Sequence, residues 1–398
     1  MPSNPYSWVQ KSLNTIYKAN WHRSVRSVTG MSGPMVEVDG RVMVNLASND
    51  YLGLASDARL IERVIAATQR YGTGSTGSRL LSGHRQLHDK LEAAIARLKK
   101  TEDAIVFSSG YLANVGTVAA LVGDRDLILA DEYNHASLRS GAALSGATVI
   151  VYSHNNIAEL AEQLSTHRTA YRRCLILTDA VFGMDGDVCP LPDILELGER
   201  FDAMTMIDEA HSAGVLGNTG AGCAEHFGCV DRPMVQMGTL SKAFASLGGY
   251  VAGSAELIDF LRNRASSWIY TTGLSPADAA AALGAIAVLE AEPERLSQLH
   301  ENVQYLKQRL DCLVCNKLES TQQDWKRLPT DSAIVCLQVK NAATVLRLGT
   351  ELRERGVFVS AVRPPTVPVS RLRMSVMATH TKDHLDQCVD ALSAVLGG

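Results

Sequence analysis

Residues 206–217 read MIDEAHSAGVLG, a short apolar run that ends in Asp208 and is followed three residues later by His211. Similar apolar runs recur along the chain, with helical stretches between them: DAIVF (103–107), DLILA (126–130), TVIVY (148–152), CLILT (174–178), AMTMID (203–208) and MVQMG (234–238). None of these runs alternates apolar and polar residues, which is typical of strands buried on both faces. We therefore predict an α/β fold with a mostly parallel sheet covered by helices.

The 398 residues are enough for more than one domain. Residues 1–54 form a predicted N-terminal segment, with an amphipathic helix over residues 1 to about 30 and a hairpin that turns at Asp39 and Gly40. Residues 55–275, in which helical stretches alternate with the apolar runs, form a predicted large domain. After about residue 275 longer helices and a few alternating strands predict a smaller α+β C-terminal domain, residues 276–398.

The composition is that of an ordinary globular protein, with 20% charged residues and a formal net charge of -4. No basic block or polybasic amphipathic segment indicates binding to nucleic acid or to a membrane surface. The apolar run 279–289 is too short to span a bilayer, and the N-terminus does not resemble a signal peptide. Eight cysteines are scattered along the chain, and the lone C-x-x-C at Cys312 and Cys315 has no nearby histidines. This pattern favours free thiols that are buried or half-buried over a zinc site or a redox role. Free thiols in turn predict a cytoplasmic protein.

A G-x-G-x-x-G pattern occurs in YGTGSTGSR (71–79) and raises the alternative of a nucleotide-dependent oxidoreductase. A dinucleotide fingerprint follows a buried strand and opens a helix. Here the preceding residues have helical apolar spacing, the next helix is predicted to begin near Gln86, and no acid follows at the distance needed for the ribose. The context therefore argues against a nucleotide site.

Reactive side chains follow several of the predicted strands, where ligands collect in sheets of this kind. MIDEAHSAGVLG supplies a buried carboxylate, Asp208; MGTLSKAFASLGGY (237–250) supplies Lys242; and VFSSGYLANVG (106–116) places Gly110 at the start of a predicted helix. Pyridoxal phosphate needs a carboxylate at its pyridine nitrogen, a lysine for its aldehyde and a helix N-terminus for its phosphate. A surface lysine and a helix-capping acid would explain these residues singly, but their combination predicts this cofactor. His135 also follows a predicted strand and could stack on the ring.

At these residues the chain resembles the α-oxoamine synthases, fold-type I pyridoxal-phosphate enzymes that condense an amino acid with an acyl thioester and release carbon dioxide. The resemblance runs from residue 45 to 381 and implies a homodimer and a sheet of the seven-stranded type. Its motifs are SNDYLGL (48–54), GSRLLSG (77–83), SSGYLAN (108–114), NHASL (134–138), MDGD (184–187), IDEAHSAGVLG (207–217), GTLSKAF (238–244) and YTTGLSP (270–276).

Within the family, VRPPTVPVSRLRMS (362–375) and TGSTGSRLLSG (73–83) resemble the members of the biotin pathway. This implies condensation of L-alanine with a pimeloyl thioester, carried by an acyl carrier protein or by coenzyme A, to 8-amino-7-oxononanoate, carbon dioxide and free carrier. The alternative is a sibling synthase that uses glycine, such as a 2-amino-3-ketobutyrate ligase. A regulatory chain without catalysis is a further alternative, but such chains tend to lose the lysine that is present here as Lys242.

The resemblance also implies a role for each matching residue. Lys242 is attached to the cofactor, Asp208 pairs with the pyridine nitrogen, and His135 stacks on the ring while His211 bonds its phenolic oxygen. The phosphate is held by Gly110, Tyr111 and Thr239, with Thr272 contributed by the partner subunit. The substrate residues are Arg373 on the amino-acid carboxylate with Asn49 near it, Ser78 and Thr366 near the acyl chain, and Arg23, for which Arg26 is the alternative. Gly183 stands where many members have serine.

Overall fold

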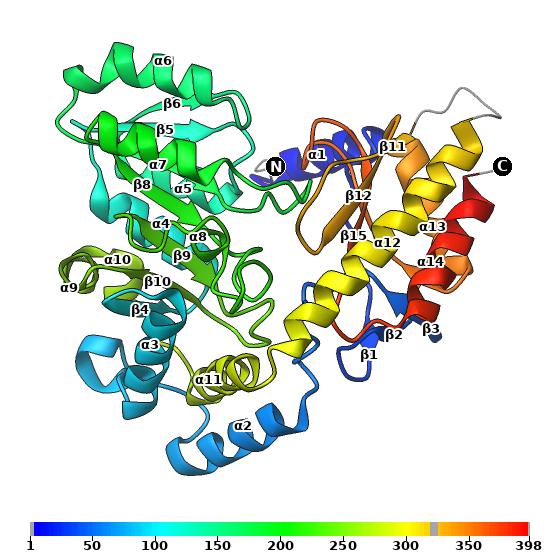
Figure 1. Ribbon diagram of the computed structural model, residues 1–398, viewed down its shortest axis with the longest axis horizontal. Helices are drawn as coiled ribbons and strands as arrows, with labels where there is room; N and C mark the ends of the chain where they lie inside the picture. Colours follow the sequence, from blue (N-terminus) through cyan, green and yellow to red (C-terminus); the bar gives the residue numbers. More distant parts are fainter. Residues whose placement is uncertain (1–3, 319–324, 397–398) are drawn as a thin grey trace.

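The computed structural model describes residues 4–318 and 325–396, without the side chains of 314–318. Its centre is a seven-stranded sheet in the order β4-β10-β9-β8-β7-β5-β6 (Figure 1). The strands are β4 (Asp103–Phe107), β5 (Leu127–Asp131), β6 (Thr148–Tyr152), β7 (Cys174–Asp179), β8 (Met204–Asp208), β9 (Val235–Thr239) and β10 (Gly249–Gly253). All run parallel except β10, which is antiparallel to both of its neighbours. The predicted α/β fold with a mostly parallel sheet is confirmed.

Helices cover both faces of this sheet, and this explains why its strands do not alternate in polarity. In β5, Ile128 and Ala130 pack into the apolar cluster that contains α4 (Gly110–Leu121) and α5 (Ala136–Ser145). Leu127 and Leu129 face the opposite cluster with α6 (Ile157–His167) and α7 (Leu191–Arg200). Successive side chains of a strand point to opposite faces, so both sets must be apolar.

Strand β10 is an element that the sequence pattern missed. It reads GYVAG, five residues that begin and end with glycine, and all five are buried. Glycine is a weak strand former, so neither composition nor periodicity marks this segment. The antiparallel direction of β10 follows from its short connection to β9, since a parallel neighbour would need a long crossover.

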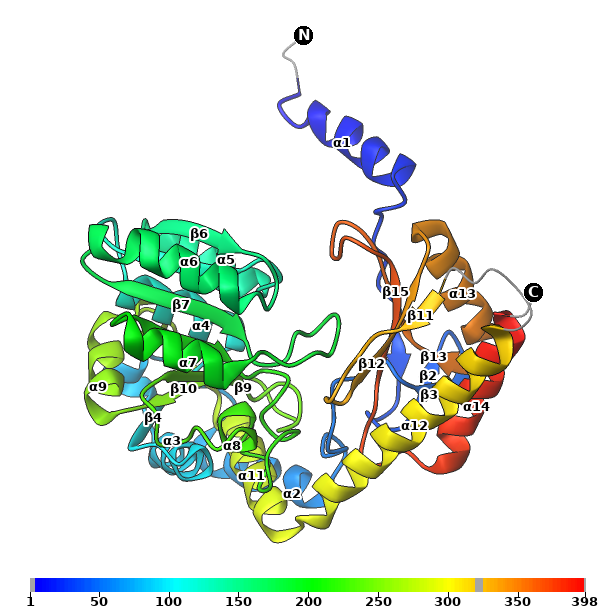
Figure 2. The same ribbon diagram turned by 45° about the horizontal axis from the view of Figure 1, so that its top comes forward.

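The small lobe, defined as the two four-stranded sheets with helices α12 to α14, takes its strands from both the N-terminal and the C-terminal parts of the chain (Figures 1 and 2). One sheet has the order β11-β12-β15-β14, and the other joins the N-terminal strands to β13 in the order β1-β2-β3-β13. The predicted hairpin at Asp39 and Gly40 is formed by β2 and β3. Bounds are β1 Val28–Thr29, β2 Met35–Val38, β3 Arg41–Asn45, β11 Trp325–Arg327, β12 Ile334–Val339, β13 Val357–Phe358, β14 Ser360–Val362, β15 Arg371–Ser375, α12 Glu294–Leu318, α13 Ala342–Glu354 and α14 Lys382–Val395.

The large lobe is the seven-stranded sheet together with helices α2 to α11. Helix α11 (Pro276–Ala291) packs against α2 (Ala58–Tyr71) and α3 (Gln86–Lys99), and α12 continues from its end into the small lobe (Figure 2). The remaining helices are α8 Cys223–His226, α9 Ala255–Arg264 and α10 Ser266–Ile269. The domain limits predicted from the sequence, 54/55 and 275/276, stay a prediction.

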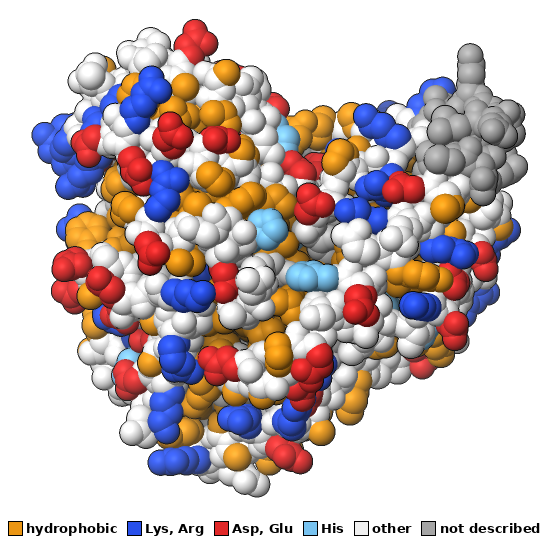
Figure 3. Space-filling model, in the orientation of Figure 1, with side chains coloured by type: hydrophobic (Ala, Val, Ile, Leu, Met, Phe, Trp, Pro, Cys, Tyr) orange, Lys and Arg blue, Asp and Glu red, His pale blue; other side chains and the backbone are white. Residues whose placement is uncertain are grey.

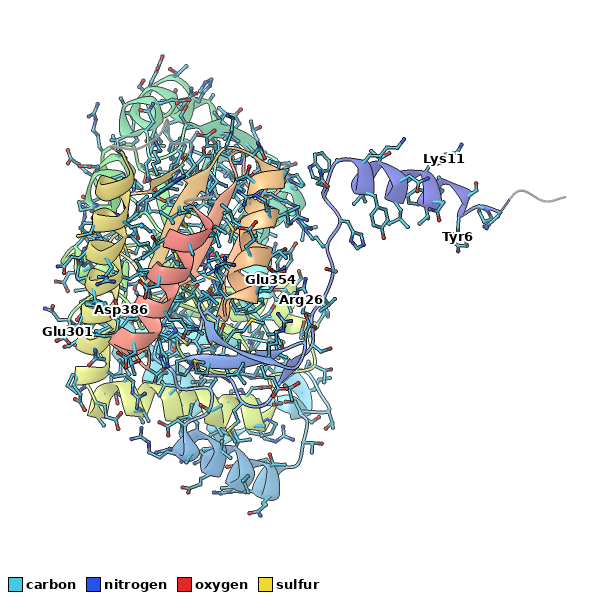
Figure 4. All side chains as sticks on the ribbon, turned by 90° about the vertical axis from the view of Figure 1, so that its right-hand side faces the viewer. Tyr6, Lys11, Arg26, Glu301, Glu354 and Asp386 are labelled. Atoms are coloured by element: carbon cyan, nitrogen blue, oxygen red, sulfur yellow. The ribbon has the colours of Figure 1, made fainter. Side chains whose placement is uncertain are left out.

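The predicted N-terminal helix is shorter than the pattern suggested: α1 spans Ser7–Lys18 and not the first 30 residues. Asn20 has a left-handed φ of 57°, which ends the helix, and residues 21–27 belong to no helix or strand. None of the residues of α1 is buried, and the helix stands away from the body, with Tyr6 and Lys11 on it (Figure 4). The apolar side chains of α1 are therefore not covered by any other part of the chain that the structure describes.

The glycine-rich stretch of residues 71–79 follows helix α2 and leads into a π-helical turn, Arg79–Gly83. The strand–turn–helix context of a dinucleotide site is absent at this stretch, as the sequence analysis predicted. Instead the Ser75 hydroxyl donates to the Leu274 carbonyl, and Ser78 forms a β-bridge with Thr272. The glycines therefore shape a loop tied to residues 272–274.

The distribution of surface charge agrees with the prediction from composition, whereas the burial of the cysteines agrees with it only in part. Acidic and basic side chains are interspersed on the face shown in Figure 3. Among the described helices none combines the length and apolar character of a bilayer span. Six of the described cysteines are buried, but Cys312 is exposed, contrary to the prediction of buried or half-buried thiols; the side chain of Cys315 lies outside the described residues. No cluster that could hold a metal ion occurs among the described residues.

One close backbone approach links the fold to the site, and we expect Gly249→Ala to disturb both. A Cβ at Gly249 would lie 2.5 Å from Cα of Gly110 at the start of α4. The substitution should lower the free energy of unfolding by roughly 1–3 kcal/mol because backbone atoms must move apart. Gly74→Ala is the control, since nothing lies within 4 Å of a Cβ there. Urea unfolding of both variants measures the effect; equal stability of the two would contradict it.

Candidate active site

Three neighbouring parallel strands deliver polar side chains to one edge of the sheet. β7 ends at Asp179, β8 at Asp208 and β9 at Thr239. Asp179 and Asp208 are register partners, and Asp208 is in register with Met237 of β9. The carboxyl ends of parallel strands meet at the same edge, so local sequence and topology together place these groups side by side.

Asp208 is a buried carboxylate whose hydrogen bonds come from neutral groups. Its side chain is 3% exposed. Asn114 Nδ2 donates to Oδ2 at 2.6 Å, and the Ala210 amide donates to Oδ1 at 2.9 Å. Burying an ionised carboxylate is costly unless a cation or strong donors compensate it. Asp208 is therefore well placed to hold a protonated ring nitrogen.

His211 joins Lys242 to Tyr51. Tyr51 Oη lies 2.6 Å from His211 Nδ1, and Lys242 Nζ lies 2.8 Å from Nε2. Burial lowers the pKa of His211 well below its ordinary value, and the charges of Lys242 and Arg373 lower it further. Burial raises the pKa of Tyr51 to about 12, so the phenol keeps its proton. A neutral imidazole has one donor and one acceptor nitrogen, so the ring relays a hydrogen bond between its two neighbours.

Lys242 lies in the turn after β9 and is half-buried. Burial lowers its pKa from 10.5 to about 8; Asp208 opposes this shift and Arg373 adds to it. At neutral pH an appreciable fraction of this lysine is therefore the free amine, whereas an ordinary lysine is almost entirely charged. This is the form that a nucleophile or a general base requires.

His135 caps helix α5 on the opposite side of the site. Its Nδ1 lies 2.6 Å from the Ser137 hydroxyl, and its backbone amide donates to Asp179 Oδ2 at 2.8 Å. Burial lowers the pKa of the His135 ring, although Asp208 opposes the shift. Burial also raises the pKa of Asp179, and the charge of Asp208 raises it further. A mostly neutral imidazole held in this way can pack against an aromatic ring.

The N-terminus of α4 forms a cradle beside β9. Ser109 caps the helix by accepting from the Leu112 amide at 3.1 Å, and Gly110 is its first residue. A Cβ at Gly110 would lie 3.2 Å from Thr239 Oγ1, so the missing side chain keeps the space between the helix and the strand open. Amides of the first helical turn have no intrahelical partners and attract anions. The Tyr111 side chain points elsewhere, donating to Ser140 Oγ at 2.8 Å.

These features fit pyridoxal phosphate. A buried carboxylate, a lysine with a lowered pKa, a neutral histidine and an anion-binding helix end surround one space, and each matches a part of that molecule. The fit rests on Asp208, Lys242, His135 and the cradle at Gly110, all at the carboxyl edge of the sheet.

Arg373 enters the site from strand β15 of the small lobe. It is buried, and its guanidinium donates to the Gly183 carbonyl at 2.6 Å, to Ser375 Oγ at 2.9 Å and to Asn49 Oδ1 at 3.0 Å. All three acceptors are neutral, so none of these hydrogen bonds supplies a counter-charge. A guanidinium in this situation is a suitable partner for a carboxylate ligand.

The remaining predicted residues lie in two further pairs. Arg23 Nη2 donates to Thr366 Oγ1 at 3.1 Å, whereas Arg26 pairs with Asp39 at 2.7 Å on the surface. Of the two N-terminal arginines, Arg23 is therefore the one joined to the 362–375 segment. Ser78 and Thr272 form a bridge, and a Cβ at the adjacent Gly273 would collide with Ser108 Oγ of the same chain. That second pair thus lies close to the cradle at the start of α4.

Comparison with known proteins identifies the chain. A family model described as aminotransferase class I and II matches residues 41–392. Relatives provisionally named 8-amino-7-oxononanoate synthase, from strains of Cyanothece and Nostoc, are each 58% identical to it. The Cyanothece alignment covers 100% of this chain and 99% of the relative, and the Nostoc alignment covers 98% and 99%. The chain belongs to the α-oxoamine synthases of the aminotransferase class I and II family.

Solved structures agree with this α-oxoamine synthase assignment. Serine palmitoyltransferase from Sphingomonas wittichii is 28% identical with a TM-score of 0.90, covering 99% of this chain and 98% of that chain. The S. paucimobilis enzyme, solved with bound pyridoxal phosphate, is 26% identical with the same TM-score and covers 98% and 97%. The Francisella tularensis 8-amino-7-oxononanoate synthase is 28% identical with a TM-score of 0.75 and covers 88% and 97%. The predicted family, fold type and cofactor are confirmed.

Gly183, where many α-oxoamine synthases carry serine, lies directly against His211. A Cβ at this position would fall onto His211 Nε2, the atom that faces Lys242. The missing side chain therefore gives the imidazole the room to reach the lysine. The carbonyl of Gly183 still serves the site, because it accepts from Arg373.

Sequence reasoning missed three residues that touch the predicted ones: Tyr51 on His211, Asn114 on Asp208 and Asp179 on the His135 amide. Tyr51 and Asn114 stand inside the SNDYLGL and SSGYLAN motifs, so a signal was present. Asp179 directly follows the apolar run 174–178, just as Asp208 ends its own run. A polar residue at the end of a second buried strand was the overlooked signal.

The lowered pKa of Lys242 can be tested by labelling the cofactor-free protein with a small amine-reactive reagent at a series of pH values. Only the unprotonated amine reacts, so modification of Lys242 should rise through about pH 8 and level off above it. Asp208→Asn should move this midpoint lower, because Asp208 favours the charged form. Mass spectrometry of the peptide that contains Lys242 measures both. A midpoint near the ordinary lysine value of about 10.4 would contradict the expectation.

Proposed function

We propose that this α-oxoamine synthase condenses L-alanine with a pimeloyl thioester and yields 8-amino-7-oxononanoate, carbon dioxide and the free carrier. The observation that carries the proposal is the placement of Arg373, a buried guanidinium bonded only to neutral acceptors, near enough to Lys242 to lower its pKa. An amino-acid carboxylate would pair with Arg373, and its α-carbon would then face Lys242. The names of the 58%-identical relatives support the product.

Bound pyridoxal phosphate supplies an aldehyde that captures the substrate amine and a ring that accepts electrons. Asp208 keeps the ring nitrogen protonated, and His135 packs against the ring. His211 would bond the phenolic oxygen of the cofactor. Gly110 and Tyr111, through the backbone at the start of α4, would hold its phosphate together with Thr239. The burial of Asp208 and the lowered pKa values of His135 and His211 support these roles.

Lys242 holds the cofactor first and moves the proton second. With the cofactor bound, Lys242 would hold its aldehyde, and Lys242 Nζ would be the base for the α-proton of alanine. A pKa of about 8 suits this work near neutral pH, because the amine is both partly unprotonated and basic enough to accept a proton. After condensation and loss of carbon dioxide, the same group returns a proton to the product.

Arg373 orients the amino acid, and other residues meet the acyl substrate. The guanidinium grips the carboxylate in a charge-assisted pair, with Asn49 steadying its far side. Ser78 and Thr366 line the acyl pocket, and Arg23, bonded to Thr366, extends that side of the site. The acyl carrier can be coenzyme A or an acyl carrier protein. Six buried free thiols support a cytoplasmic setting.

A homodimer completes the site in this proposal. Large apolar side chains near the cradle and the glycine-rich loop are exposed: Leu80, Leu81, Tyr111, Leu247 and Tyr270. Tyr270 is 84% exposed, two residues before Thr272. Apolar groups gathered in this way mark an interface, and most soluble oligomers are symmetric dimers. We infer that Thr272 reaches the phosphate of the second subunit.

Substrate specificity is tested with purified protein, pyridoxal phosphate and pairs of substrates. L-alanine with a pimeloyl thioester should give 8-amino-7-oxononanoate by mass spectrometry, and Lys242→Ala should abolish turnover. Turnover of glycine with an acetyl thioester, and none with the pimeloyl substrate, would instead assign a sibling reaction. Running both pimeloyl carriers in parallel identifies the donor.

The shared site is tested by mixing two inactive variants, Lys242→Ala and Thr272→Trp, after unfolding and refolding together. A site built from two subunits recovers activity in the heterodimer, because one of its two sites receives Lys242 and Thr272 intact. Random pairing predicts about a quarter of the wild-type activity. No recovery, although native mass spectrometry shows that heterodimers form, would contradict the crossing of Thr272.

A further inference from the structure

Residues 182–188, which follow β7 in the large lobe, form a loop that contacts the small lobe. The loop is closed at its base by a β-bridge between Val181 and Val188, and the Gly186 amide donates to the Phe182 carbonyl at 2.7 Å. It contains Gly183, whose carbonyl accepts from Arg373. The place of this loop therefore affects the residue that grips the amino acid in the proposed function.

Strand β15 holds the loop with two arginines from the same side. Arg371 and Arg373 are two residues apart in the strand and so point the same way. Arg371 forms an ion pair with Asp185, and Arg373 donates to the Gly183 carbonyl at 2.6 Å. On the small-lobe side, Thr330 and Ser332 hydroxyls each donate to the Gly186 carbonyl at 2.7 Å. These contacts fix the position of the loop relative to strand β15.

The other end of the loop is held by His154, which follows β6. Its Nε2 lies 2.7 Å from Asp187 Oδ2, and its Nδ1 lies 3.0 Å from Asp131 Oδ1 at the end of β5. The ring stacks on Tyr133 at 4.4 Å between centroids and meets the edge of Phe182 at 4.3 Å. The histidine thereby ties the loop to the sheet edge.

His154 is suited to this task because it carries a charge. Burial alone would lower its pKa, but hydrogen bonds to Asp131 and Asp187, and their charges, raise it to about 9. Both ring nitrogens then donate at neutral pH, one to each carboxylate. The next residue adds a second bond, since Asn155 Nδ2 donates to Asp187 Oδ2 at 3.0 Å.

We propose that His154 is a positioning residue for the amino-acid substrate: it clamps Asp187 to Asp131 and so fixes the loop that aligns Arg373. The inference rests on the proposed function for its substrate, but the clamp itself is a property of residues 131, 154 and 187. His154 acts through the loop and not by contact with the reacting atoms. Its loss should therefore weaken amino-acid binding more than it slows the chemistry.

The test compares His154→Asn, Asp187→Asn and the double variant in the holoenzyme, with the exposed His226→Asn as control. Losing a hydrogen bond to a charged group should raise the KM for L-alanine about tenfold, with kcat and the KM for the pimeloyl thioester changed by less than about threefold. The double variant should be no worse than the stronger single variant, because both substitutions remove the same link. His226→Asn should behave as the wild type.

Hydrogen exchange of the amides in residues 183–188 provides a readout that needs no turnover. Exchange there should quicken in His154→Asn and Asp187→Asn, while amides of β7 and β8 keep their protection. Unchanged loop exchange, additive effects, or an equal loss of kcat and of affinity for both substrates would overturn the clamp. A wild-type protein that does not turn over L-alanine would contradict the proposed function, whereas the exchange result would still decide on the clamp.

Discussion

The cost of burying the Asp208 carboxylate is the constraint on which the site depends. Its two hydrogen bonds come from an amide side chain and a backbone amide, neither of which carries a charge. A cationic ring nitrogen above it offsets that cost, so the fold favours a ligand that the carboxylate keeps protonated. Asp179 lies beside it in register and accepts from the His135 amide. The same edge of the sheet thus positions Asp208, His135 and, after the neighbouring strand β9, Lys242.

The two lobes supply different parts of the site: the large lobe supplies the groups that fit the cofactor, and the small lobe supplies the arginine that fits the substrate carboxylate. The groups that fit the cofactor come from the carboxyl ends of strands and from the starts of α4 and α5, all in the large lobe. Arg373 comes from β15 of the small lobe and meets the large lobe at Gly183; it also donates to Asn49, in the segment between β3 and α2. The loop of residues 182–188 is the part of the large lobe that both arginines of β15 touch. Alignment of the substrate therefore depends on contacts between lobes, whereas placement of the cofactor does not.

Two residues without side-chain chemistry of their own set distances in the site. Gly249 lets β10 approach the start of α4, and Gly183 leaves room for His211 to face Lys242. In both places a Cβ would collide with another part of the site, so the geometry of the site depends on the absence of a side chain at these two positions. The sequence motif shows only that Gly183 departs from the family. The structure shows the consequence, which is that His211 has room to face Lys242.

The parallel strands could be predicted from the sequence because burial on both faces requires continuous apolar runs, and the polar residues ending them pointed to Asp208, Thr239 and Lys242. The family motifs identified His135, His211 and Arg373. Strand β10 was missed because its glycines carry no strand signal, and α1 was predicted too long because a periodic pattern does not reveal where packing stops. Tyr51, Asn114 and Asp179 were passed over because a hydrogen-bonding role depends on which partner the fold brings within 3 Å. Local sequence thus determined the strands and the chemistry at their ends. Only the tertiary structure decided that Arg373 meets Gly183 and that His154 bridges two carboxylates, since both involve residues far apart in the chain whose distance depends on strand order and lobe packing.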